Sequence, residues 1–323
     1  MPQTKCLFAA VLALATLAHV PVACAQAEEH WPARRVAFIV GYASGGFADN
    51  VARVLSRRMA EQWKQTVVVQ NMAGAGGNIA ARSVSTAAPD GYTLLATTTS
   101  LAINDTLYRD KGFRTDGLTT VAIPVEAPEL LVTNAKSGIR TFADLVSKAR
   151  SGPIYLGSSG IGSGSHISAE YALRILAKVD VKHIPFAGGN PAMLALMTGD
   201  ITVMASTATA IPSIQSGESL GIAIGSQTRS TVLPNVPTYT ENGLTGFTAS
   251  SWTGLFAPKG TPVAVLEAIN AGVNEALHDQ ETLRQLKALG VLPVPKTRAE
   301  SERFFFEEIR NWEKMVLAIG LSG

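Results

Sequence analysis

Three segments of the sequence are rich in glycine, serine or threonine where an apolar run ends: residues 41–49, 97–104 and 157–166. Each apolar run predicts a β-strand, and a helix is expected to follow each segment. Ligands of open α/β sheets sit beyond the carboxyl ends of strands, where the next helix directs free N–H groups and a partial positive charge. One such turn is more often a plain connection. Three in equivalent positions favour an anion-binding cleft that needs no arginine or lysine.

Two residues of these turns could be interpreted as catalytic groups. His166 lies among serines, and with a neighbouring serine it would make a secreted hydrolase, which we keep as an alternative. The chain has no Gly-x-Ser-x-Gly elbow, however, and a histidine at a helix start commonly lines a cleft or bonds to the backbone. Asp49 follows Gly46 closely and is better explained as a residue that caps the helix or orders the glycine turn. We therefore predict no catalytic residue.

The remaining motifs predict neither a cofactor nor a metal ion. Segment 74–79 follows a strand and opens a helix like a dinucleotide-binding turn, but Ile79 replaces its last small residue. No acidic residue ends the next strand to bind a ribose, so we interpret this segment as a tight structural turn. The other histidines of the expected mature chain, His30, His183 and His278, are scattered along the sequence and lack the spacing of metal ligands.

The elements that must position these turns form an α/β pattern, because short apolar strands alternate with amphipathic helices. The expected strands cover residues 35–40, 66–70, 92–96, 121–123, 130–133, 154–156, 181–184, 201–204 and 220–224. The first expected helix begins near residue 48, and four more cover 75–86, 141–150, 167–177 and 191–197. Three further helices are expected after residue 261. Capping boxes are expected at Thr141 and Thr297.

Composition limits the protein to a folded, globular class. Of the 323 residues, 46% are apolar and 16% are charged, and the formal net charge is +2. Two domains are expected at this length. A small net charge without a long basic run gives nucleic-acid binding no support.

The first 25 residues have the pattern of a secretory signal peptide. An apolar stretch at 7–17 is too short to span a bilayer, and Ala23-Cys24-Ala25 supplies a small-x-small cleavage site. The only two cysteines, Cys6 and Cys24, fall in this segment, so the mature chain has no disulfide. Lipidation of Cys24 is an alternative that the residues before it fit poorly. We therefore expect a periplasmic protein.

A series of motifs follows in order along the chain. They are Trp31-Pro32, Gly45-Gly46-x-x-Asp49, Val67-Val68-Val69-x-Asn71-x-x-Gly74-Ala75-Gly76-Gly77-Asn78-Ile79, Ala88-Pro89-Asp90-Gly91-Tyr92-Thr93-Leu94-Leu95, Leu101-Ala102-Ile103-Asn104-x-x-Leu107-Tyr108, Gly164-x-His166, His183-Ile184-Pro185-Phe186, Leu233-Pro234-Asn235-Val236-Pro237-Thr238 and Ala257-Pro258-x-Gly260-Thr261-Pro262. Each is weak alone, but their order is specific. The sequence resembles the Bug-type extracytoplasmic receptors of tripartite tricarboxylate transporters.

The resemblance implies a two-domain, periplasmic-binding-protein-like α/β fold of the Venus flytrap, type II class. Residues 31–132 plus 253–323 would form domain 1 and residues 133–252 domain 2, with the ligand cleft between them. It implies a monomeric receptor, not an enzyme, that delivers a small carboxylate to the permease subunits of the transporter. The carboxylate would be a di- or tricarboxylate, an acidic amino acid or an aromatic acid. A ligand-sensing module for a two-component system would use the same fold and remains an alternative.

The resemblance also implies how the ligand is held: by backbone amides, hydroxyls and water, with the turn after the first strand as a main contact. Together with the three turns, it places the ligand contacts at Tyr42, Ser44, Gly45, Gly46, Phe47, Asp49, Thr98, Thr99, Ser158, Ser159, Gly162, Ser165, His166 and Ser206.

Three positions depart from the resembled family. Ala43-Ser44 stands where Pro-Pro is frequent, Phe47 where small residues are common, and Ser206 where an aspartate is frequent. The loss of a cleft carboxylate at residue 206 removes a partner for a ligand amine. Our hypothesis is that free amino acids are disfavoured and that a plain or aromatic acid is preferred.

Overall fold

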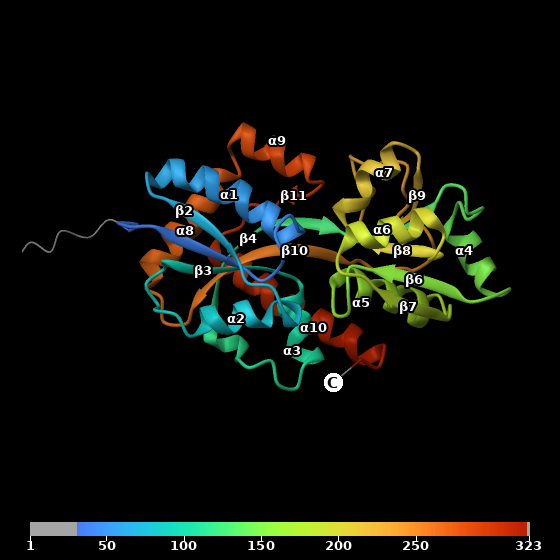
Figure 1. The fold of residues 1–323 in the computed structure, drawn as a ribbon, viewed down its shortest axis with the longest axis horizontal. Helices are drawn as coiled ribbons and strands as arrows, with labels where there is room; N and C mark the ends of the chain where they lie inside the picture. The colour runs from blue at the N-terminus through green and yellow to red at the C-terminus, as the bar shows by residue number, and fades with distance from the viewer. Residues whose placement is uncertain (1–30, 322–323) are drawn as a thin grey trace, which may run out of the picture. The chain divides into compact units, whose positions relative to one another are not determined.

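Two β-sheets organise residues 31–321, which the computed structural model describes (Figure 1). The first sheet has the strand order β11-β4-β10-β3-β1-β2. Its strands are β1 (Val36–Val40), β2 (Val67–Asn71), β3 (Thr93–Thr98), β4 (Leu118–Pro128), β10 (Ser250–Pro258) and β11 (Leu292–Pro293). The strands β1, β2 and β3 are parallel, whereas β10 runs antiparallel to both β3 and β4.

Helices cover both faces of this first sheet (Figure 1). They are α1 (Phe47–Trp63), α2 (Asn78–Ser85), α3 (Ser100–Leu107), α8 (Val263–Ala276), α9 (Gln280–Ala288) and α10 (Arg298–Ala318), with short 3₁₀ turns η1 (Ala75–Gly77) and η2 (Thr115–Gly117). Alternation along β1 explains the two layers. Phe38 packs in one core with Leu55 of α1 and Ile269 of α8, whereas its neighbour Ile39 packs with Ile103 of α3 in the other.

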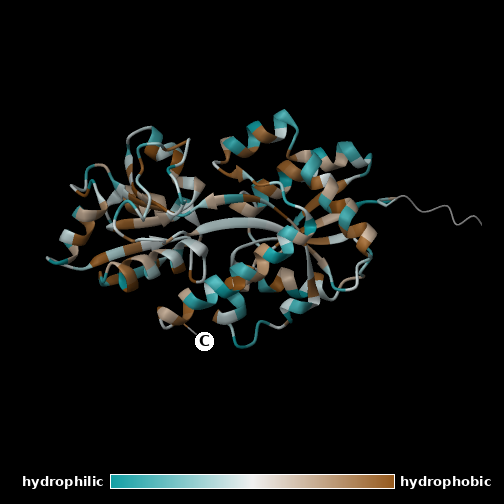
Figure 2. Ribbon diagram, turned by 180° about the vertical axis from the view of Figure 1, so that it is seen from behind, coloured by the Kyte–Doolittle hydropathy of each residue, from teal (hydrophilic) through white to brown (hydrophobic). Residues whose placement is uncertain are grey.

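The second sheet has the order β7-β6-β8-β5-β9 and is smaller. Its strands are β5 (Leu130–Asn134), β6 (Ile154–Ser158), β7 (Val181–Pro185), β8 (Val203–Ser206) and β9 (Ser219–Ile224). Its helices are α4 (Phe142–Ala149), α5 (Gly164–Glu170), η3 (Tyr171–Leu176), η4 (Ala208–Ala210), α6 (Gly189–Thr198) and α7 (Ile211–Gln215). Helices at the surface carry hydrophilic and hydrophobic residues together, as amphipathic segments do (Figure 2).

The two sheets are joined where three segments of the chain, at residues 129, 225 and 249, are hydrogen-bonded to one another. Glu129 alone separates β4 from β5, and its backbone N–H donates to the Ala249 carbonyl at 3.0 Å. Its own carbonyl accepts from the Gly225 N–H at 2.7 Å, and Ala249 donates back to Gly225. A Cβ at residue 225 would lie 2.1 Å from the Ala249 oxygen, so only glycine fits there. These contacts fix the point at which the chain crosses from one sheet to the other.

Several predicted elements shift by a few residues for local reasons. Both predicted capping boxes form, at Thr141 and at Thr297. The helix expected at 167–177 instead begins at Gly164, because the Ser163 side chain caps it by accepting from the His166 N–H. It continues as a π-helix from Tyr171 to Leu176. None of the helices in the described chain has the length and apolar character needed to cross a membrane.

Candidate ligand-binding site

The first turn, residues 41–46, is shaped by one carboxylate. Asp49 is only 1% exposed, and its Oδ2 accepts from the Gly45 N–H and from Arg53 Nε, both at 2.8 Å. Its Oδ1 accepts from Asn71 Nδ2 at 2.8 Å. Burial opposes ionisation, yet the hydrogen bonds from Arg53, Gly45 and Asn71 hold the pKa of Asp49 below its ordinary value. Asp49 therefore orders the glycine turn, as one of our two interpretations had it, and its direct contact with the ligand stays a prediction.

Beyond Asp49, the first turn opens towards solvent. The N-cap of α1 is Gly46, which has no side chain to satisfy the first helical amides. Ser44 and Gly45 are exposed, and Phe47 is half-buried beside them. A long helix that begins on exposed, uncapped backbone can accept an anion.

The second turn connects the first turn to the third. Tyr42 and Thr98 join their hydroxyls at 2.8 Å, which ties the first turn to the end of β3. Ser100 Oγ donates to the Gly162 carbonyl at 3.4 Å, which ties the second turn to the third across the two sheets. Thr99 is buried, and its hydroxyl accepts from the Trp252 N–H at 2.9 Å, so this side chain has a structural role. The three predicted turns thus lie together.

The third turn, residues 158–166, is held by serine and histidine side chains. The Ser165 hydroxyl lies 3.0 Å from that of Ser159 and 3.1 Å from that of Ser163. His166 Nδ1 accepts from the Gly162 N–H at 3.2 Å. Ser159 is exposed, whereas Ser165 and His166 are buried. Accordingly, Ser159 is available to a ligand while the others support it.

Ser206, at the end of β8, is the last predicted contact. Its hydroxyl lies 2.8 Å from that of Thr209, and the side chain is buried in this structure. The two hydroxyls are hydrogen-bonded to each other at the position where the resembled family often has an aspartate.

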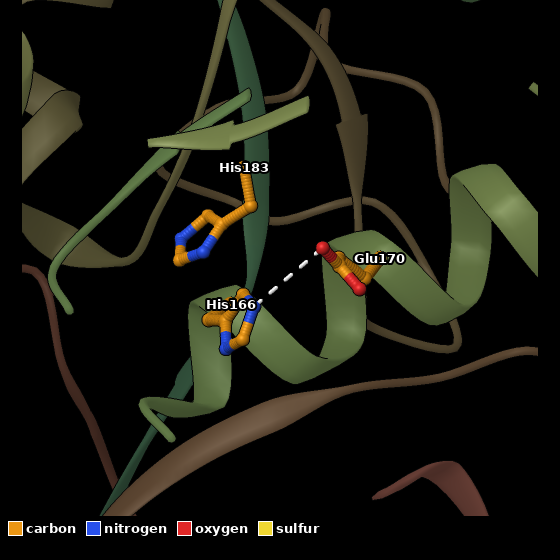
Figure 3. A group of neighbouring side chains, drawn as sticks. All are labelled: His166, Glu170 and His183. Carbon is orange, nitrogen blue, oxygen red and sulfur yellow. Dashed lines mark ion pairs between the residues drawn. The ribbon is translucent and has the colours of Figure 1, made fainter. Parts of the chain in front are cut away.

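One sequence-based expectation about the histidines is wrong. His183 is not isolated, because β7 places its ring against that of His166, with centroids 3.7 Å apart and planes at 21° (Figure 3). Glu170 lies one turn along α5, and its Oε1 is 3.7 Å from His166 Nε2. The ligand atoms of the three residues all lie within 4.8 Å of one another, a composition that suits a transition metal.

The arrangement of this cluster does not aim at a single ion. An imidazole binds a metal along a lone pair in the plane of its ring, so two nearly parallel rings stacked on one another do not converge. Arg174 also occupies the carboxylate, with Nη1 3.0 Å from Glu170 Oε2. The group is a stacked, hydrogen-bonded cluster beneath the third turn.

Comparisons with known proteins agree with this architecture. The family model of the tripartite tricarboxylate transporter family receptor matches residues 51–321. Protein BugT of Bordetella pertussis is 34% identical over 311 residues, which cover 94% of this chain and 95% of BugT. This chain belongs to the tripartite tricarboxylate transporter receptor family.

Solved structures of similar proteins contain small carboxylates. MatC from Rhodopseudomonas palustris, solved with bound malate, is 35% identical with a TM-score of 0.80, and the match covers 88% of this chain and 100% of MatC. A second R. palustris protein, solved with adipate, is 30% identical with a TM-score of 0.84 over 90% of this chain and 99% of its own. The periplasmic binding protein BugD is 28% identical with a TM-score of 0.81, over 90% of this chain and 99% of BugD.

The receptor is therefore a two-domain periplasmic binding protein of the type II fold and not an enzyme, as the sequence predicted. The hydrolase alternative is set aside. The ring of His166 faces Gly162 and Glu170 in the described chain, so it is not paired with a serine hydroxyl. The predicted signal peptide and Cys24 lie outside the described residues.

Sequence reasoning missed several supporting residues of the receptor. The i,i+4 spacing of His166 and Glu170 was a signal that both lie on one helix face. His183 and Asn71 gave no local signal, because separate strands bring them to the turns from far along the chain.

Proposed function

We propose that this receptor captures a small organic carboxylate between its two sheets and delivers it to the permease subunits of a tripartite transporter. The observation that carries the proposal is the first turn, where the exposed Gly45 and the half-buried Gly46 precede a helix of 17 residues without a side-chain cap. Helix N-termini of this kind favour carboxylates. Relatives solved with malate and adipate support the same ligand class.

The predicted contacts separate into two groups that we propose act differently. Tyr42, Ser44, Gly45, Gly46, Phe47, Thr98 and Ser159 are exposed or half-buried, and we propose that they touch the ligand directly. Asp49, Thr99, Ser158, Gly162, Ser165, His166 and Ser206 are buried and would hold the first group in place. Charge-assisted hydrogen bonds contribute about 1.5–3 kcal/mol each. Three or four of them suffice for micromolar affinity, about −8 kcal/mol, after ordering costs.

The proposed domain division follows the sheets closely. Residues 31–132 plus 253–323 would form one domain and 133–252 the other. The chain passes from one sheet to the other within a few residues of these bounds. Ligand binding would select a closed arrangement by bending at Glu129 and Gly225. A secretory signal in the first 25 residues would export the chain to the periplasm as a monomer.

Isothermal titration calorimetry of the mature chain, residues 26–323, tests the proposal. The panel contains malate, adipate, benzoate, aspartate, glutamate, glucose and zinc. We expect binding of a plain or aromatic acid at micromolar concentration, without turnover of the bound ligand, and little response to the amino acids. Binding of glucose alone, or of no carboxylate at all, would sink the proposal. Micromolar binding of aspartate or glutamate without any response to benzoate would overturn only the ligand preference.

A further inference from the structure

The third turn is fastened at both ends by the same pair of stacked rings. At its start, Ser158 Oγ lies 2.7 Å from His183 Nε2. Near its end, the Gly162 N–H donates to His166 Nδ1 at 3.2 Å. His166 belongs to α5 and His183 to β7, and Figure 3 shows the two rings lying face to face. The stack therefore links both ends of the turn to one another.

We propose that His166 and His183 are positioning residues that hold the third turn in its binding conformation, and that they do so only while both rings are uncharged. This inference rests on the proposed function, because the third turn supplies part of the proposed ligand site.

Proton placement explains why a charged ring would release the turn. A nitrogen that accepts from a backbone N–H must carry a free lone pair, so Nδ1 of His166 is unprotonated when Gly162 donates to it. The remaining ring proton then belongs on Nε2, which faces Glu170 Oε1 at 3.7 Å. A second proton on His166 would place two N–H donors opposite one another at Gly162, and that hydrogen bond would be lost.

His183 reinforces this requirement. Burial lowers the pKa of His183 to about 4, and a positive charge on His166 would lower it in the same direction. The negative charge of Glu170 acts in the opposite direction. Two cationic rings stacked at 3.7 Å would repel each other strongly. The stack therefore tolerates protonation poorly.

Other charged groups near α5 do not cancel this effect. The carboxylate of Glu170 is shared between His166 and Arg174, which overcome the effect of burial and lower its pKa. Glu129, in the β4–β5 connection, lies against the start of α5: a Cβ added at Gly164 would be 2.7 Å from Glu129 Oε1. From α10, Glu308 is engaged by the Nε1–H of Trp312, at 2.7 Å.

The sign of the pH dependence follows from linkage. The folded chain takes up the His183 proton only near pH 4, whereas the unfolded chain takes it up near 6.5. The contribution of His183 to stability is therefore complete above about pH 6.5 and is lost as the pH falls towards 4. At pH 4 about half of the folded molecules carry this proton, so we expect the dissociation constant for the carboxylate to rise about twofold between pH 6.5 and pH 4.

Amide substitutions separate charge from shape. An Asn side chain places its oxygen near the position of Nδ1, so His166→Asn keeps an acceptor for Gly162 without titrating. A Gln side chain reaches the position of Nε2, so His183→Gln keeps a partner for Ser158. In the double variant, the affinity for malate or adipate should fall between pH 6.5 and pH 4 only as far as protonation of the ligand itself requires. His166→Leu should weaken binding at every pH, and the exposed His278→Gln, which also removes a histidine, should leave the wild-type pH profile unchanged.

Two measurements keep this inference separate from the proposed function. Calorimetry with malate and adipate from pH 6.5 to pH 4 reports on binding. In the ligand-free protein, the amide resonances of the glycines report on the turn itself. We expect the Gly162 amide shift to titrate in the wild type and to stay constant in the double variant. A Gly162 resonance that is insensitive to pH in the wild type, or a double variant that loses as much affinity in acid as the wild type does, overturns the inference. Absence of carboxylate binding at every pH, with Gly162 still titrating, would instead overturn the proposed function.

Discussion

The first and third turns are built alike and fixed by different chemistry. Each follows a strand and opens a helix, but Asp49, which takes its hydrogen bonds as an anion, holds the first turn, and a pair of neutral histidines holds the third. The pKa of Asp49 lies below its ordinary value, so its contribution to stability is present above about pH 3.8 and lost only below it. One half of the proposed site should therefore ignore the pH range in which the other half responds.

The largest expected effect is the removal of the anion at the first turn. Asp49→Ala leaves Gly45, Arg53 and Asn71 without their acceptor, and we expect it to lower the free energy of unfolding by about 3 kcal/mol and to weaken binding about 100-fold. Urea unfolding and calorimetry measure both. The matched control is Asp144→Ala, which removes a carboxylate that organises the start of α4. It should lower stability and spare affinity, and equal loss of affinity in both variants would refute the role of the first turn.

A substitution at the ligand-facing backbone gives a smaller effect. Gly45 and Gly138 both have φ +79° with nothing within 4 Å of an added Cβ. Alanine at either position should therefore cost about the same stability, roughly 1–2 kcal/mol for the left-handed conformation. Only Gly45→Ala should weaken carboxylate binding, by about tenfold, because only this glycine lies in the proposed site. Matching affinities for the two variants would remove the first turn from the site.

A third prediction concerns the carboxyl group beneath the third turn. Glu129 is 1% exposed, its Oε2 has no hydrogen-bond partner, and burial raises its pKa to about 8. A raised pKa gives stability that is complete below about pH 4.5 and lost as the pH rises towards 8, the opposite slope to that of His183. Thermal melting between pH 6 and pH 8 should show the wild type losing up to about 1.4 kcal/mol per pH unit. Glu129→Gln should remove most of that slope, and an unchanged slope would contradict the assignment.

The smallest expected effect is on specificity. Ser206→Asp restores a carboxylate where we expect a ligand amine to lie, so aspartate and glutamate should gain affinity a few-fold while plain acids lose it. Ser206→Ala should leave the binding of plain acids nearly unchanged and shows whether the position tolerates substitution. Competition calorimetry with glutamate against adipate measures the ratio. A ratio that stays constant in Ser206→Asp would mean that this position does not select the ligand.

Local patterns revealed most of the fold and the outline of the proposed site. Some features depend only on residues that are close together in the sequence, and these were predicted correctly. They are the capping boxes at Thr141 and Thr297 and the apolar alternation of β1. The direct partners of the turns are not local. His183 and Asn71 reach their turns only because separate parallel strands bring them there, and the motifs that contain them do not say which residues they contact. Burial was equally hidden, since Thr99 and Ser206 resemble exposed hydroxyls until the sheets are assembled.

A crystal structure of residues 26–323 with adipate or malate is the most direct test of the central claim. The account predicts a ligand carboxylate at the uncapped start of α1, within hydrogen-bond distance of the Phe47 backbone N–H, with Ser159 on the opposite side. A carboxylate bound elsewhere would contradict it. One such place is the hollow of about 630 Å³ lined by Glu308, Thr245 and Ser250.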